Sequence, residues 1–261
     1  MELLVCIKQV PDDSVTVTLD PATGGPQLKD ITPVVNAFDT YALEMATRFK
    51  EANGGSVTVM SIGDTAALTP SMRSCLSVGA EHAYVVEEAG AASTVGRAYL
   101  LGQAAGKLAE GPFDVIFCGC ESTDTADGQV GVQLAEQLGL PVITNILELE
   151  PVEGGIRAKQ ETEDGYRVVE APVPCVVTVT KPAYEPRYPS IKSKMAARKM
   201  PIGSVSAADA GAEGGRVSVA PVQRVGLAMP PQRQSGVKIQ EKDPADAVRR
   251  AMEMLGAQKL I

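Results

Sequence analysis

The sequence predicts an α/β protein built on a doubly wound, mostly parallel sheet. Short continuous apolar runs, typical of strands buried on both faces, recur along the chain. Segments with helical spacing of apolar residues separate these runs, and glycines close most of them. With 261 residues, 44% of them hydrophobic, the chain can bury one large core and carry an appendage.

Strands and helices are expected to alternate through the first half of the chain. The predicted strands are 3–7, 56–62, 83–86 and 114–118, and the predicted helices are 36–53, 65–78, 93–109 and 128–139. This alternation favours parallel pairing with helical crossovers. The alternating segment 15–19 and the turn-forming residues 20–25 predict a small hairpin inserted after the first strand. Asn36 is expected to cap the first helix, and Asp39 to favour its N-terminus.

The pattern changes after Pro141. The predicted strands 142–149, 156–162 and 166–170 follow one another with no helix between them, which indicates an antiparallel extension. The apolar run 175–179 predicts a buried strand that returns to the main sheet.

The C-terminal region cannot build a core of its own. Residues 203–232 are rich in Gly, Ala, Ser and Pro, no aromatic residue follows Tyr188, and one modest helix is expected over 244–255. We therefore expect a nucleotide-binding domain over 1–190 and an arm over 191–261 that packs on another surface. A flexible tail is the alternative.

Composition excludes several functions. The net charge of −8 argues against a general nucleic-acid binder. No run reaches membrane-spanning length, and the N-terminus lacks the pattern of a signal peptide. The five cysteines are not paired at metal-site spacings and His82 is the single histidine, so no metal site is expected. Cys6, Cys118 and Cys175 lie in apolar runs and suit reduced core residues of a cytoplasmic protein.

The strand ends are the expected place for a ligand, because doubly wound sheets bind ligands outside the carboxyl ends of their strands. The long polar loop 119–131 follows one such strand and runs into a helix N-terminus, which suits a phosphate. Asp124 and Asp127 would repel a phosphate placed against them, and they suit ribose hydroxyls or helix capping. An elaborate cap without a ligand is an equally good interpretation of the pattern.

The sequence contains few signs of catalysis by side chains. The sequence has no GxGxxG fingerprint, no P-loop, no GxSxG and no HExxH, and its one histidine leaves little room for a triad.

The segment 181–200 is locally basic in an acidic protein. Its cations are Lys181, Arg187, Lys192, Lys194, Arg198 and Lys199, against the single acid Glu185. Ile191 and Met195 are apolar residues among these charges. A transient docking surface typically combines charges that guide the approach of a partner with an apolar residue that holds the complex. An ordinary exposed loop is nevertheless the commoner explanation of a run of charged residues.

Taken together, these segments resemble the β subunit of electron-transfer flavoproteins. The resemblance rests on VCIKQVPD, VVNAFDTYALEMA, CGCESTDTADGQVGVQLAEQLGLP, PCVVTV, EPRYPSIKSKMAARK and PPQRQSGVK, in this order along essentially the whole chain. It implies a Rossmann-like core similar to adenine-nucleotide α-hydrolase folds, and a heterodimer with an FAD-holding α subunit that the C-terminal arm wraps.

The resemblance also implies a nucleotide in this chain, either AMP or, in the electron-bifurcating branch, a second FAD. The family's nucleotide contacts map onto Cys6, Asn36, Ala37, Phe38, Asp39, Ile62, Gly119, Cys120, Glu121, Ser122, Thr123, Asp124, Thr125, Ala126, Asp127, Gly128, Gln129 and Val130. The family loop usually has an acid where Ala126 stands, and Asp127 follows one position later.

The family's loop for docking dehydrogenases maps onto 186–195, with Ile191 in place of its leucine anchor. The expected partner-docking residues are Glu185, Arg187, Tyr188, Ile191 and Met195.

The KQVPD start and the DTYALEMA helix look closer to the bifurcating branch. This resemblance implies FAD in the β site, with AMP as the alternative. It also implies NADH as electron donor, an acyl-CoA-type or other flavin dehydrogenase as one acceptor, and ferredoxin or flavodoxin as the other. The rival hypotheses are a stand-alone nucleotide sensor similar to universal stress proteins and an adenylate-forming or hydrolytic enzyme of the same fold.

Overall fold

The computed structural model describes residues 1–88, 93–108, 112–219, 222, 225–232 and 235–261. Its strands are β1 (Glu2–Cys6), β2 (Gln9–Pro11), β3 (Pro33–Val35), β4 (Ser56–Ile62), β5 (His82–Glu87), β6 (Val115–Gly119), β7 (Val142–Val152), β8 (Gly155–Thr162), β9 (Gly165–Pro172), β10 (Cys175–Val179) and β11 (Gly203–Ser206). Its helices are α1 (Ala37–Asn53), α2 (Thr65–Ser77), α3 (Thr94–Leu108), α4 (Val130–Leu138), α5 (Ile191–Ala197), α6 (Gly214–Val217) and α7 (Pro244–Ala257). The predicted end of the third helix at Ala109 lies outside the described residues, as do Arg233 and Gln234 of the PPQRQSGVK segment.

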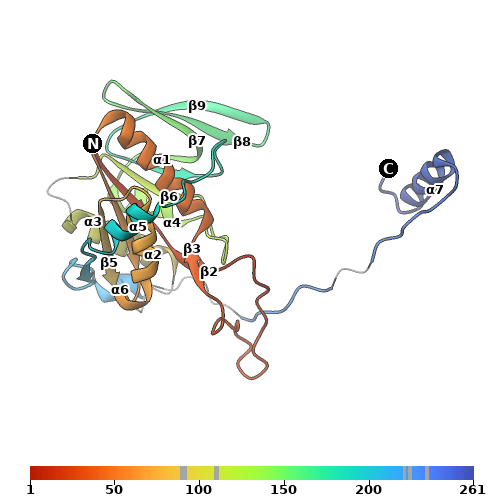
Figure 1. The fold of residues 1–261 in the computed structure, drawn as a ribbon, viewed down its shortest axis with the longest axis horizontal. Coiled ribbons are helices and arrows are strands. Elements are labelled where there is room, and N and C mark those ends of the chain that lie inside the picture. The colour runs from red at the N-terminus through yellow and green to blue at the C-terminus, as the bar shows by residue number, and fades with distance from the viewer. Residues whose placement is uncertain (89–92, 109–111, 220–221, 223–224, 233–234) are drawn as a thin grey trace. The chain divides into compact units, whose positions relative to one another are not determined.

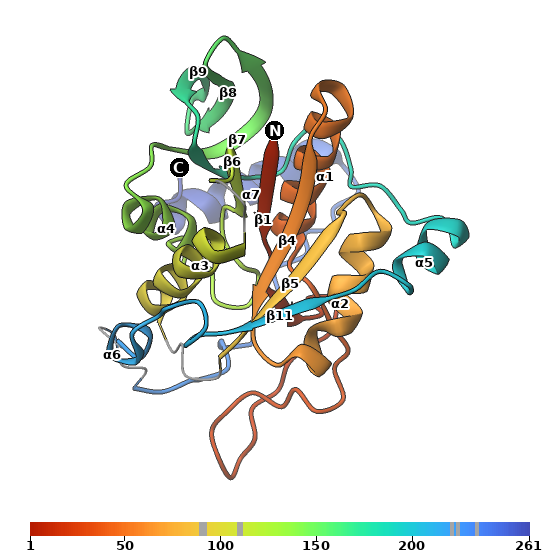
Figure 2. The same cartoon turned by 90° about the vertical axis from the view of Figure 1, so that its left-hand side faces the viewer.

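The main sheet has the strand order β11-β5-β4-β1-β6-β10-β7-β8-β9. Figure 1 shows β7, β8 and β9 at the top, and Figure 2 shows β11, β5, β4 and β1 side by side. β1 pairs in parallel with both β4 and β6, and β5 and β10 extend the parallel part on either side. The chain therefore winds first to one side of β1 and then to the other, which confirms the predicted doubly wound sheet.

Helices cover both faces of this sheet (Figure 2). Alternate side chains of β1 pack on opposite faces of the sheet, because successive side chains of a strand point to opposite sides. Leu3 and Val5 belong to one core cluster with residues of α1 and α2, whereas Leu4 and Cys6 belong to a second cluster with residues of α3 and α4. The apolar runs of the sequence are thus strands buried on both faces, as expected.

The antiparallel extension is also confirmed. β8 pairs antiparallel with β7 and β9, while β10 lies between β6 and β7 and is parallel to both. The strand predicted to return to the main sheet therefore does so.

The predicted hairpin over 15–19 is wrong in its strands. The small antiparallel pair is formed instead by β2 and β3, with Val10 opposite Val34. Val10 is buried, whereas Val15 is 44% exposed, so the alternating pattern at 15–19 has no apolar surface to cover. The predicted turn does form, since the Asp20 amide donates to the Gly25 carbonyl at 2.8 Å.

The tail contributes to the main sheet more than its composition suggests. β11 adds a parallel strand beside β5, and α6 contacts α3, where Arg216 lies over the ring of Tyr99 at 4.0 Å. One compact unit comprises 1–17 and 26–225, and a second comprises 18–25 and 226–261. The first unit thus extends past the expected boundary at 190, because β11 completes hydrogen bonding along β5.

The second unit contains α7, which begins at the predicted residue. Asp243 caps it by accepting a hydrogen bond from the Ala245 amide. Val248, Met252 and Leu255 are exposed along this helix.

In the part of the chain that the structure describes, no helix is long and apolar enough to cross a membrane.

Candidate functional site

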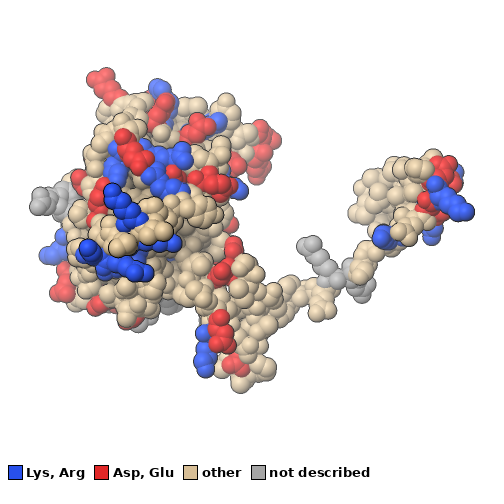
Figure 3. Space-filling view, in the orientation of Figure 1, with Lys and Arg blue, Asp and Glu red and all other residues tan. Residues whose placement is uncertain are grey.

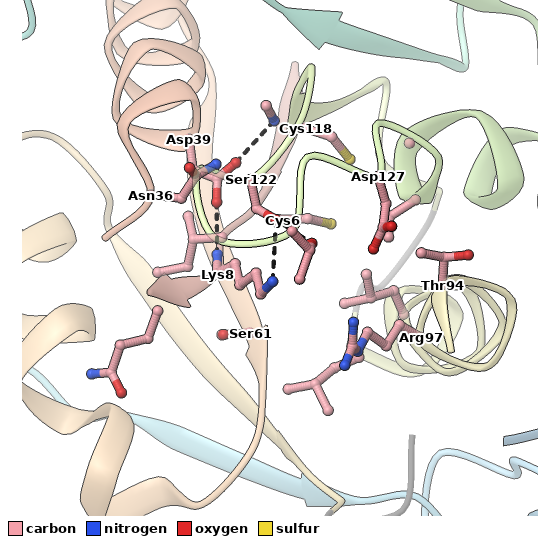
Figure 4. A pocket seen from close by; sticks show the side chains of 18 of the residues that line it. Cys6, Lys8, Asn36, Asp39, Ser61, Thr94, Arg97, Cys118, Ser122 and Asp127 are labelled. Atoms are coloured by element: carbon pink, nitrogen blue, oxygen red, sulfur yellow. Dashed lines mark hydrogen bonds between the residues drawn. The ribbon is translucent and has the colours of Figure 1, made fainter. Parts of the chain in front are cut away.

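A cavity of about 420 Å³ opens at the carboxyl ends of β1, β4 and β6 (Figure 4). This is the place where the strand order reverses, and doubly wound sheets bind their ligands there. Its volume lies within the range of about 300–1,000 Å³ that is usual for ligand pockets. The lining residues are Cys6, Ile7, Lys8, Gln9, Asn36, Asp39, Ser61, Ile62, Gly63, Asp64, Ala67, Leu68, Glu88, Thr94, Arg97, Leu101, Cys118, Gly119, Cys120, Glu121, Ser122, Thr125, Asp127, Gly128, Gln129, Val130 and Gly131.

Most of the residues predicted to contact a nucleotide line this one cavity. Those that do are Cys6, Asn36, Asp39, Ile62, Gly119, Cys120, Glu121, Ser122, Thr125, Asp127, Gly128, Gln129 and Val130. Those that do not are Ala37, Phe38, Thr123, Asp124 and Ala126. After Gly119, the last residue of β6, residues 120–129 have no regular secondary structure and lead into α4, as the sequence predicts.

Asn36 does not use its side chain to cap α1, contrary to the prediction. Its amide Nδ2 donates to the Glu121 carbonyl at 2.8 Å, and its Oδ1 accepts from the Thr123 amide at 3.1 Å. The residue stands at the N-cap position without a side-chain cap bond. Its amide instead fixes the loop 119–128, because that loop offers both a donor and an acceptor beside it.

Asp39 ties two strands together beside the cavity. Its Oδ2 accepts from the Lys8 amide at 2.7 Å, and its Oδ1 accepts from the Gly119 amide at 3.0 Å. The residue is only 5% exposed. Although it lies in the first turn of α1, its carboxyl group mainly satisfies the backbone where β1 and β6 end.

Burial of Asp39 raises the pKa of its carboxyl group to about 7, against the lowering effect of hydrogen bonds from Lys8, Asn36 and Gly119. Desolvation disfavours the charged form more than these donors stabilise it. Protonated Asp39 is therefore favoured below neutral pH.

This carboxyl group predicts a pH dependence of stability. The folded chain keeps the Asp39 proton up to about pH 7, whereas an unperturbed carboxyl loses it near 3.8. The contribution of Asp39 to the free energy of unfolding is complete below the lower value and is lost as the pH rises through about 7. The free energy of unfolding in denaturant, measured across this pH interval for the unmodified protein and for Asp39→Asn, gives this contribution. The asparagine amide has no proton to release in this interval, so its variant is the reference. A stability difference between the two proteins that does not change with pH would contradict it.

Asp124 is an exposed residue that forms an ion pair within the chain. Its Oδ1 lies 2.6 Å from Lys8 Nζ, which also donates to Ser122 Oγ at 3.1 Å. Burial opposes ionisation of Asp124, but hydrogen bonds from Lys8 and Ser122 outweigh it and lower the pKa of this carboxyl. The ion pair offsets the negative charge of Asp124 beside the position where the sequence predicts a phosphate. Asp127, by contrast, lines the cavity itself.

Two glycines allow the close packing that shapes the cavity. A Cβ at Gly119 would lie 2.3 Å from Asp39 Oδ1, and a Cβ at Gly131 would lie 2.6 Å from Thr178 Cγ2 and 3.3 Å from Cys118 Cβ. Gly131 lies in the first turn of α4. Its missing side chain lets the N-terminus of α4, with its free amides, lie close against β6 and β10.

One wall of the cavity was not predicted. It is formed by the start of α2 and the first turns of α3, and its residues are Asp64, Ala67, Leu68, Thr94, Arg97 and Leu101. Both helices follow parallel strands, so the strand-end rule that indicated the loop 119–131 would also have found them. Gln9 joins β2 to this wall, since its Nε2 donates to Ser71 Oγ at 2.9 Å.

The predicted docking residues fall into two groups: three are exposed, and two contact residues of α1. Tyr188, Ile191 and Met195 are 95%, 81% and 59% exposed. Arg187 instead forms ion pairs with Glu44 and Glu51 of α1. Glu185 accepts a hydrogen bond from the Tyr41 hydroxyl at 3.0 Å.

The fold and the cavity define this chain as a doubly wound α/β protein with a cavity at the switch point of its sheet, the place where this class of fold binds ligands. A family model described as the electron transfer flavoprotein domain matches residues 30–210. The chain belongs to the electron transfer flavoprotein family, and its relatives include β subunits that it matches over its full length.

Three relatives illustrate this. The electron transfer flavoprotein subunit beta of Megasphaera elsdenii is 35% identical over all of both chains. Subunit CarD of the caffeyl-CoA reductase-Etf complex of Acetobacterium woodii is 35% identical, with 77% of each chain covered. Protein FixA of Azorhizobium caulinodans is 30% identical over 95% of this chain and 92% of its own. The role of the family is electron transfer, and its β subunits pair with an α subunit.

Proposed function

We propose that this chain is the β subunit of an electron-bifurcating electron transfer flavoprotein and holds FAD in the cavity at the switch point. The observation that carries this proposal is the extent of the cavity. Beyond the residues expected to hold an adenylate, it continues along the starts of α2 and α3. A ligand larger than AMP would use this additional wall.

The side chains suit such a ligand. The loop 119–130 and the free amides at the start of α4 would hold the adenylate and a phosphate. Lys8 supplies a cation that Asp124 holds beside the loop. Ile62, Leu68 and Leu101 supply apolar surface at the other wall, which a flavin ring needs.

The protein's contribution is binding and orientation. When bound, FAD supplies hydride acceptance from NADH and transfer of single electrons, so no side chain of this chain needs to act as a general acid or base. Asn36 and Asp39 keep the loop 119–128 and the ends of β1 and β6 in place.

Partners follow from the surfaces that remain exposed. We assign the arm, residues 226–261, to the α subunit, because the apolar residues of α7 are exposed. We assign the apolar residues Tyr188, Ile191 and Met195 to a flavin dehydrogenase of the acyl-CoA type. The name of the Acetobacterium relative, which belongs to a caffeyl-CoA reductase complex, supports this class. Ferredoxin or flavodoxin is the proposed low-potential acceptor.

The nucleotide content of the purified heterodimer tests the proposal. We expect two FAD and no AMP per heterodimer, measured by extraction, chromatography and flavin absorbance. One FAD and one AMP would overturn the assignment of FAD to this chain and indicate a non-bifurcating protein. A colourless homodimer with a bound nucleotide would support the stand-alone sensor instead.

A further inference from the structure

The docking segment, defined here as residues 185–200, presents an apolar face within a basic surface. Its exposed apolar residues are Tyr188, Ile191 and Met195. Lys192, Lys194, Arg198 and Lys199 lie in the same short stretch of sequence, and Figure 3 shows lysines and arginines gathered on the face that carries α5. A partner that matches this segment has an apolar centre and an acidic rim.

Arg187 fastens the first end of this segment to α1. Its Nε lies 2.8 Å from Glu44 Oε2, and its Nη1 and Nη2 lie 2.6 and 2.9 Å from the two carboxylate oxygens of Glu51. The Arg187 backbone amide also donates to Glu44, at 3.2 Å. The Glu44 side chain is only 2% exposed, so its carboxylate is shielded from water, whereas the Arg187 side chain is 33% exposed. Planar, bidentate contacts of this kind restrict direction as well as distance.

Arg73 of α2 fastens the other end. Its Nη1 donates to the Ala197 carbonyl at 2.5 Å and also to the Met200 carbonyl. These carbonyls lie at and just beyond the C-terminus of α5, where the regular hydrogen bonds of a helix end. The side chain of Ser190 caps the opposite end of α5 by accepting from the Ser193 amide at 3.0 Å.

α5 needs such support because it has only seven residues. A helix of this length is not stable in water by itself. Without external fixation the segment would have to become ordered when a partner binds, and that ordering weakens binding.

We propose that Arg187 and Arg73 are positioning residues for electron-transfer docking. They hold the docking segment against α1 and α2, so that Tyr188, Ile191 and Met195 are already arranged for an apolar, acid-rimmed pocket of the dehydrogenase. This inference rests on the proposed docking function, and it assigns to Arg187 a role directed inward rather than a contact with the partner.

The test uses the intact heterodimer with its flavin dehydrogenase. We expect Arg187→Gln to raise the KM for the dehydrogenase about tenfold, a loss of about 1.4 kcal/mol. The rate at saturating dehydrogenase and the nucleotide content should stay unchanged. Arg187→Lys should recover only part of the loss, because one ammonium cannot reproduce the forked contacts. Arg73→Gln should raise the KM in the same direction. Hydrogen exchange over 185–200 should become faster in both glutamine variants.

Arg157→Gln is the matched control. Arg157 also pairs with two glutamates, Glu150 and Glu170, but on the antiparallel extension. The KM of the Arg157→Gln variant for the dehydrogenase should equal that of the unmodified protein.

Ile191→Ala separates this inference from the proposed function. If Ile191→Ala slows electron transfer while Arg187→Gln leaves the KM unchanged, the positioning role is refuted and the docking site stands. If Ile191→Ala has no effect, the docking assignment itself fails. A loss of nucleotide from Arg187→Gln would show a general structural defect and would also refute the positioning role.

Discussion

Replacing Asp39 by alanine is expected to destabilise the protein by about 2–6 kcal/mol, the largest effect of any single change considered for this chain. The carboxyl group accepts hydrogen bonds from the Lys8 and Gly119 amides, and little of it is exposed. Truncation leaves two partly buried donors without an acceptor, and each costs up to about 1–3 kcal/mol. The ends of β1 and β6 would separate, and these ends form part of the cavity.

Denaturant unfolding measures the loss of stability, and nucleotide extraction measures the loss of the site. Asp164→Ala is the control, because Asp164 is an exposed acid in the turn between β8 and β9. Its effect should lie within about 0.5 kcal/mol of zero. Asp39→Asn should be intermediate, since an amide keeps one acceptor but turns its NH₂ toward the second backbone donor. Equal unfolding midpoints for Asp39→Ala and Asp164→Ala would contradict the structural role.

Gly131→Ala is expected to cost about 1–3 kcal/mol and to lower the nucleotide content. The added Cβ would lie 2.6 Å from Thr178 Cγ2 and 3.3 Å from Cys118 Cβ, in side chains that β10 and β6 hold in place. The strain would displace the N-terminus of α4, whose amides line the proposed phosphate position.

Gly106→Ala in α3 is the matched control for Gly131→Ala. Gly106 is also a helical glycine, but a Cβ built there meets nothing within 4 Å. Alanine should stabilise that position by about 0.5–1 kcal/mol, because it lowers the entropy of the unfolded chain. The thermal unfolding midpoint should therefore rise in Gly106→Ala and fall in Gly131→Ala, and only Gly131→Ala should lose nucleotide. A stabilised Gly131→Ala that keeps its nucleotide would show that α4 can shift without cost.

α1 connects the two functional regions. Asn36 and Asp39, at its start, hold the loop 119–128 and the end of β6. Glu44 and Glu51, further along the same helix, hold Arg187. One helix therefore sets the position of the docking segment relative to the cavity. Under the proposed function, this rigid element would fix the distance between the bound FAD and the docked dehydrogenase.

The sequence was sufficient where local patterns dominate. Apolar runs such as Leu3–Ile7 and the glycines after the helices predicted the strands, the helices and their alternation. Because ligands bind where parallel strands end, the same patterns also indicated the loop 119–131. They did not indicate β11, because its four residues, GSVS, carry no apolar run, and it forms only as an addition to β5.

By itself, the sequence determined the fold class, the alternation of the main strands and helices, and the edge of the sheet where the cavity lies. Tertiary structure alone decided which partners the polar side chains take. Asn36 holds Glu121 and Thr123 rather than its own helix, and Arg187 turns toward Glu44 rather than outward. The physical reason is that apolar periodicity acts over a few neighbouring residues. A hydrogen bond across 85 or 143 positions exists only after the sheet has brought its two ends together.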